Sequence, residues 1–79
     1  YTLGGLTIPE REMITFCFLA AQGGCEPQLL AHAKGNLKVG NDADFLTRVT
    51  LTALPYIGYP RTLNALSALR EAKSEEKTF

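Results

Sequence analysis

The chain has 79 residues, 46% of them hydrophobic, and its eight basic residues balance its eight acidic ones. A chain this short buries only about 60–65% of its unfolded surface, so a surplus of apolar residues favours association with further copies. The balanced charge argues against nucleic-acid binding and against electrostatic attachment to anionic membranes, both of which need clustered Lys and Arg. The longest apolar run, "FCFLAA", is too short to span a bilayer.

Residues 1–6 lack the basic region and the apolar run of a secretory signal, and two cysteines are too few for a disulfide framework. We therefore expect a cytoplasmic protein with free thiols. We expect a single domain over residues 1–79, with frayed ends at 1–5 and 73–79, because the tail "REAKSEEKTF" is highly charged.

The first predicted helix lies within residues 7–24. Thr7 and Glu10 have the spacing of a capping box, Pro9 suits a first helical turn, and Gly23-Gly24 is a typical stop. At 100° per residue, Phe18 falls within the polar stripe of this helix, which makes it a candidate subunit contact. Glu12 instead falls on an apolar face, between the directions of Phe16 and Leu19.

The second predicted helix runs roughly from residue 26 to 39, with Pro27 in its first turn and Gly40 as its stop. One stripe of this helix is apolar and faces the core. A neighbouring stripe borders the core, where a pocket lining would lie; its members are Cys25, Gln28, His32 and Asn36.

The third predicted helix follows "GNDADF", with Asn41 or Asp42 as its cap, and Pro55 is expected to kink or break its end. The segment "YIGYP" then forms a corner, and Pro60 begins a fourth helix that ends near Ala72. Because no segment alternates like a strand, we predict an all-α domain of about four helices arranged as antiparallel hairpins.

Three side chains are candidates for chemistry. Cys25 precedes a helix, where the helix dipole favours a thiolate, although a small half-buried residue beside a turn would have the same pattern. His32 lies two turns further along the same face, about 10 Å in axial rise, and imidazole titrates near neutral pH. Glu12 would be desolvated on its apolar face and could exchange a proton with either, or it could simply favour the first turn of its helix.

No metal or cofactor site is expected. The chain has neither a CxxC nor an HxxxH pair, and Gly23-Gly24 lacks the Lys and Ser or Thr of a phosphate-binding loop. Cys17 lies in an apolar run in mid-helix and is expected to be an unreactive core residue.

The blocks "GGCEPQLLAHAKGNLKVG" and "YIGYPRTLNAL" are similar to segments of the carboxymuconolactone decarboxylase family, which has the alkyl hydroperoxide reductase D-like fold. The resemblance covers Leu6 to Ala72. It implies that Cys25 and His32 match the first cysteine and the histidine of the thiol relay in the peroxidase-type members. Glu12 matches the relay glutamate with an offset of one residue, and Gln28 stands where the second cysteine would be.

The resemblance implies two activities. We favour thiol-dependent peroxidase or oxidoreductase chemistry of a one-cysteine kind centred on Cys25 and His32, because decarboxylation gives the cysteine no role. The first alternative is a lactone decarboxylase in which His32 transfers a proton and Arg61 binds a substrate carboxylate; the second is a non-catalytic oligomeric binding protein. Gln28 and Tyr59 complete the expected binding residues for a small-molecule substrate, and the family implies a homo-oligomer, from dimer to hexamer.

Overall fold

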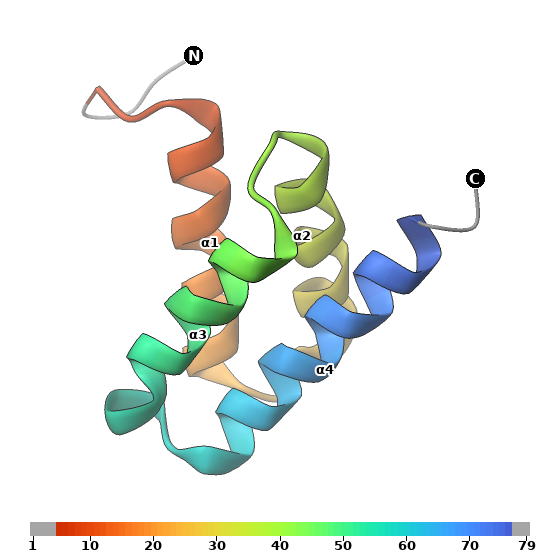
Figure 1. Ribbon diagram of the computed structural model, residues 1–79. Helices are drawn as coiled ribbons and strands as arrows, with labels where there is room; N and C mark the ends of the chain where they lie inside the picture. Colours follow the sequence, from red (N-terminus) through yellow and green to blue (C-terminus); the bar gives the residue numbers. More distant parts are fainter. Residues whose placement is uncertain (1–4, 77–79) are drawn as a thin grey trace.

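The computed structural model describes residues 5–76, which form four α-helices and no strand (Figure 1). The helices are α1 (Ile8–Gln22), α2 (Glu26–Lys38), α3 (Ala43–Ile57) and α4 (Tyr59–Glu76). The all-α prediction is therefore confirmed. None of these helices has the length and hydropathy needed to cross a membrane.

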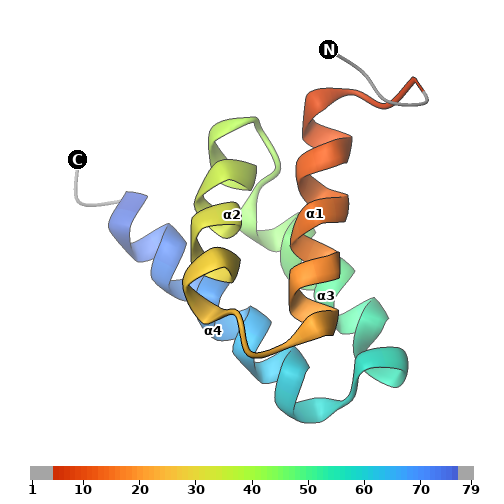
Figure 2. The same cartoon turned by 180° about the vertical axis from the view of Figure 1, so that it is seen from behind.

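The first two helices form an antiparallel hairpin, and α4 lies against α2 with α3 at its other side (Figures 1 and 2). The main helix contacts are those of α2 with α4, of α3 with α4 and of α1 with α2. By comparison α1 touches α3 and α4 only slightly, so α1 is held chiefly by α2.

The capping box predicted at the start of α1 is present. The Thr7 hydroxyl accepts the Glu10 backbone N–H at 3.2 Å, and the Glu10 carboxylate accepts the Thr7 backbone N–H at 2.8 Å. The Thr7 backbone N–H and the Thr7 hydroxyl, the latter at 3.1 Å, both donate hydrogen bonds to the Glu10 carboxylate, and these two bonds lower the pKa of Glu10. The helix ends at Gly23, whose φ of 74° is a conformation that glycine adopts readily.

The start of α3 resolves which residue caps it. Asp42 is the cap, because its Oδ1 accepts the Phe45 backbone N–H at 2.8 Å. Of the kink or break expected at Pro55, the break is wrong, since α3 continues through Pro55 to Ile57. Pro55 lies in the last turn, where its missing N–H removes only one hydrogen bond before Gly58 ends the helix.

The last helix is longer than predicted at both ends. It begins at Tyr59 rather than Pro60, and it continues to Glu76, so residues 73–76 are helical rather than frayed. An ion pair between Lys34 on α2 and Glu75 on α4 helps to hold this end and lowers the pKa of Glu75. Gly5 forms a turn, while residues 1–4 and 77–79 lie outside the described residues.

The core lies where all four helices meet. Phe16 from α1 and Leu46 from α3 are completely buried, and small alanines on α4 allow the neighbouring helices to approach closely. The buried apolar residues are Phe16, Ala20, Leu29, Ala33, Leu46, Ala65, Ala68, Leu69 and Ala72.

Several aromatic side chains lie on the surface. Phe18 is 70% exposed, as its place in the polar stripe indicated, and Tyr56 and Tyr59 are 88% and 66% exposed. Whether these aromatics contact another subunit stays a prediction, and they mark the faces where association would bury apolar area.

Candidate functional site

The hairpin of α1 and α2 brings Glu12 and His32 together. Nδ1 of His32 lies 3.2 Å from Oε1 of Glu12, and the two side chains are 39% and 29% exposed. Each is therefore open to a small molecule yet partly shielded from water. This pair is the centre of the candidate site.

The contact determines which imidazole nitrogen carries the proton. A carboxylate only accepts hydrogen bonds, so Nδ1 of His32 must donate to Glu12. In the neutral imidazole, Nε2 then keeps its lone pair and can act as a base. The pair can thus take up a proton at Nε2 and release it again.

Cys25 occupies a different position. It caps the start of α2, and its thiol donates a hydrogen bond of 3.3 Å to the backbone carbonyl of Leu19 in the last turn of α1. The same carbonyl accepts the Gly23 backbone N–H at 3.2 Å. The thiol therefore joins the two helices of the hairpin as a donor, a role that a thiolate cannot fill.

The three predicted substrate-binding residues are all exposed, and they are spread over two helices. Gln28 lies on α2, whereas Tyr59 and Arg61 lie in the first turn of α4. The Arg61 side chain crosses to the connection between α1 and α2: a Cβ built on Gly23 would lie 2.7 Å from Nε of Arg61. Arg61 thus lies beside the connection that leads to Cys25.

A buried amide network lies next to the pair and was not predicted. Asn36 is fully buried, and its Nδ2 donates to the backbone carbonyls of Glu12 at 2.9 Å and of His32 at 2.7 Å. Its Oδ1 accepts Nδ2 of Asn41 at 2.8 Å, and Asn41 also donates to the carbonyl of Pro9 at 2.8 Å. The sequence signal was the spacing of Asn36 four residues after His32, on the stripe that borders the core.

The sequence pattern did not identify Gly35 as part of the candidate site. A Cβ built on this residue would lie 3.0 Å from Oε1 of Glu12, so the glycine leaves the space that the carboxylate occupies. A glycine in the interior of a helix costs about 1 kcal/mol relative to alanine, which is the signal that a close approach is required there.

A model of the carboxymuconolactone decarboxylase family matches residues 1–71. The chain belongs to this family. No curated protein and no solved structure matches the chain significantly.

The match to the carboxymuconolactone decarboxylase family contains every candidate residue described above, and it contains the Asn36–Asn41 network as well. Within residues 5–76 of this family member, no group of three or more His, Cys, Asp or Glu side chains could hold a metal ion.

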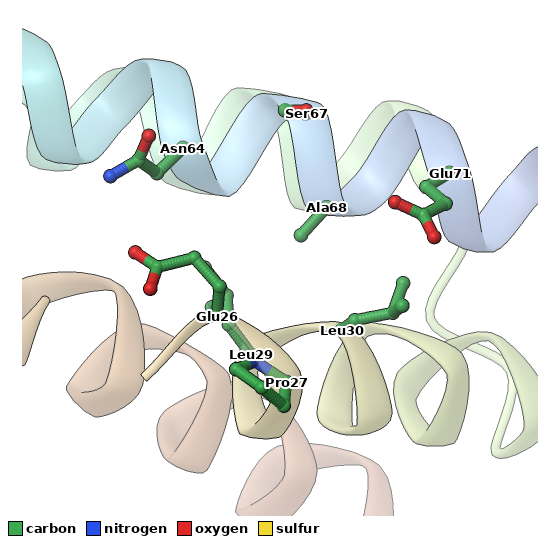
Figure 3. Close-up of a pocket in the computed structure, with 8 residues that line it drawn as sticks. All are labelled: Glu26, Pro27, Leu29, Leu30, Asn64, Ser67, Ala68 and Glu71. Atoms are coloured by element: carbon green, nitrogen blue, oxygen red, sulfur yellow. The ribbon is translucent and has the colours of Figure 1, made fainter. Parts of the chain in front are cut away.

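A groove between α2 and α4 lies apart from the pair (Figure 3). Its volume is about 270 Å³, and Figure 3 shows the carboxylates of Glu26 and Glu71 beside it with Leu30 between α2 and α4. Because neither Glu12 nor His32 lines the groove, we do not assign the chemistry of this family member to it. The lining residues are Glu26, Pro27, Leu29, Leu30, Asn64, Ser67, Ala68 and Glu71.

The expectation that Cys17 is a core residue is wrong, because Cys17 is not one of the buried residues of the core. Cys17 is half-buried in α1, and burial raises the pKa of its thiol. A raised pKa leaves less thiolate at neutral pH, as expected for an unreactive residue.

Proposed function

We propose that this protein is a lyase of the carboxymuconolactone decarboxylase type, in which His32 transfers a proton to a small carboxylated lactone. The observation that carries the proposal is the 3.2 Å contact between Nδ1 of His32 and Glu12, which leaves Nε2 available for proton transfer. Family membership supports the same reaction class.

The proposed step needs one proton and no oxidant. The bond between the carboxylate and the lactone carbon breaks, CO₂ leaves, and the electron pair of that bond moves into the conjugated lactone. Protonated His32 then delivers one proton from Nε2 to carbon, and the neutral imidazole regains a proton from water. Glu12 holds the ring in place and stabilises its charged form through the hydrogen bond at Nδ1.

Arg61 is the proposed partner of a substrate carboxylate. Its guanidinium is exposed beside Gly23, where it can form two parallel hydrogen bonds to a carboxylate. Replacing it by lysine keeps the charge but removes this fork, so Arg61→Lys should raise KM more than it lowers kcat.

The contrast with thiol chemistry rests on Cys25. Its thiol donates to the Leu19 carbonyl, and no partner thiol exists at position 28, where glutamine stands. Proton transfer by His32 uses the contact already present in the structure, whereas thiol chemistry requires that the Cys25 hydrogen bond first be broken.

The test measures the consumption of carboxymuconolactone, which is monitored by the ultraviolet absorbance of the substrate. We expect His32→Ala to lower kcat by roughly 100-fold or more, the usual contribution of a general acid or base. Cys25→Ser should retain turnover, and Arg48→Ala, an exposed change on α3, is the matched control. Lactone turnover that survives His32→Ala would refute the proposal.

A one-cysteine peroxidase is the second candidate, and the place of Cys25 at the start of α2, where the helix dipole favours a thiolate, supports it. In this reaction a Cys25 thiolate attacks one peroxide oxygen, the O–O bond breaks, and a sulfenic acid and an alcohol or water form. Two external thiol molecules then reduce the sulfenic acid to the thiol, releasing water and a disulfide. Peroxide consumption abolished by Cys25→Ser but not by Cys17→Ser would support this function over the lyase.

We further propose that the protein forms homo-oligomers through surfaces that include Phe18. The residue is 70% exposed on α1, where an isolated aromatic side chain gains from burial against another copy. Light scattering of the protein and of Phe18→Ser tests this, with a smaller particle expected for the variant. A stable oligomer that turns over neither lactone nor peroxide would instead support a binding protein.

The two free cysteines are compatible with the expected cytoplasmic location.

A further inference from the structure

We propose that Asn36 is a positioning residue for the Glu12–His32 pair. Its amide fixes the backbones of the two residues relative to each other, so that Nδ1 of His32 meets the Glu12 carboxylate. The inference concerns the site of the proposed function, but it follows from hydrogen bonds that exist whatever the substrate is.

The geometry of the amide supports this role. Nδ2 of Asn36 has two N–H groups, and the structure gives it two acceptors: the carbonyl of Glu12 on α1 and the carbonyl of His32 on α2. These are the backbone groups of the two residues whose side chains meet at 3.2 Å. One side chain therefore ties both members of the pair at the backbone.

The orientation of the amide is determined by its surroundings. Backbone carbonyls only accept hydrogen bonds, so the NH₂ group of Asn36 must face Glu12 and His32. Asn41 fixes the other side, because its Nδ2 donates to Oδ1 of Asn36. A reversed amide would place oxygen against two carbonyls and NH₂ against NH₂, so only one orientation satisfies every group.

Complete burial makes the arrangement costly to change. Asn36 is 0% exposed between α1 and α2, and a buried polar group needs partners inside the protein. An apolar side chain of similar volume would fill the same space without linking the two carbonyls. The amide is therefore better explained by the alignment it imposes than by packing.

The test measures the tautomer of His32 rather than turnover. In the intact protein at a pH where the imidazole is neutral, ¹⁵N NMR shifts of the ring nitrogens report which one carries the proton. We expect mostly the Nδ1–H form in the unaltered protein, because Glu12 accepts from Nδ1. In Asn36→Leu, the Nδ1–H fraction should fall to about half or less, towards the Nε2–H form that free imidazole prefers.

Two further variants keep the test decisive. Thr50→Val is the matched control, since Thr50 is also buried and hydrogen-bonded, to Leu46 on α3, but does not touch the pair. Asn41→Ala removes the donor that orients Asn36, together with the Asn41 hydrogen bond to the Pro9 carbonyl, and keeps the Asn36 side chain, so it tests the proposal if Asn36→Leu fails to fold. An unchanged tautomer ratio in a folded Asn36→Leu, or in Asn41→Ala where the first variant does not fold, would overturn the proposal.

The result is distinguishable from failure of the proposed function. A tautomer shift in Asn36→Leu, absent from Thr50→Val, supports positioning even if the protein never turns over a lactone. A loss of lactone turnover in Asn36→Leu with an unchanged tautomer ratio overturns positioning, while leaving His32 as the proton carrier.

Discussion

Replacing Gly35 by alanine should make the protein more stable while damaging its candidate site. Gly35 lies in the interior of α2, where alanine is favoured over glycine by about 1 kcal/mol. The opposing effect is the approach of the new Cβ to Oε1 of Glu12, at 3.0 Å. That oxygen is the end of a flexible side chain that is 29% exposed, so it can move by a few tenths of an ångström towards water.

The expected net change follows from these two effects. We expect Gly35→Ala to raise the free energy of unfolding by about 0.5–1 kcal/mol, because the helix gain exceeds the small displacement of Glu12. For a domain of this size, a gain of 1 kcal/mol corresponds to a rise in Tm of about 4–8 °C. The displaced carboxylate should weaken the contact with His32, and lactone turnover should fall by roughly tenfold.

Two measurements test this combination: thermal unfolding followed by circular dichroism, and the ¹⁵N shifts of His32. Ala31→Gly is the matched control, because it makes the reverse change at an exposed position of the same helix. It should destabilise the protein by a similar amount and leave the His32 tautomer unchanged. A destabilised Gly35→Ala would mean that Glu12 cannot move away, and a stabilised variant with an unaltered tautomer would mean that Gly35 does not position the pair.

Three further outcomes are expected. Gly23→Ala should lower the free energy of urea unfolding by about 1–3 kcal/mol, because φ 74° and ψ 164° are almost restricted to glycine and the new Cβ would lie 2.7 Å from Nε of Arg61. Arg61→Ala should cost far less, which separates the strain at Gly23 from the loss of the Arg61 side chain. Burial raises the pKa of the Cys17 thiol in the folded protein. The stability that the protonated thiol contributes is therefore present below the ordinary thiol pKa and is lost as pH rises through the pKa of the folded state. Cys17→Ala should flatten the alkaline end of the curve of unfolding free energy against pH. The pKa of Glu10 is lowered in the folded protein, so its carboxylate contributes stability above the ordinary glutamate pKa, and this stability is lost as pH falls through the pKa of the folded state. Thr7→Ala should reduce this loss of stability in acid.

The helices could be predicted because the signals that begin and end them are local. The Thr7–Glu10 box and the glycine at Gly23 act within a few residues, and both are present in the structure. The effect of Pro55 was misjudged because the penalty of a proline depends on its distance from the end of the helix. The end of α4 forms an ion pair with Lys34 in a different helix, a contact that no local pattern reveals.

The candidate site could be predicted only where side chains meet side chains. The helical angle of Glu12 placed it on an apolar face, and the structure accounts for the charge by a contact with His32. The Asn36 amide and the Cys25 thiol also donate to backbone carbonyls of α1, which every residue possesses and which no pattern within α2 indicates. Their roles therefore became visible only once the packing of α1 on α2 was known.

The way in which α1 is attached to the other helices affects the lifetime of the contact between Glu12 and His32. α1 contacts mainly α2, yet it contributes the completely buried Phe16 to the core that all four helices share. Opening of α1 would therefore carry Glu12 away from His32 and also expose part of that core. The hydrogen bonds that Asn36, Asn41 and the Cys25 thiol donate to carbonyls of α1 oppose this opening together with the burial of Phe16, so the lifetime of the Glu12–His32 contact is coupled to the stability of the core.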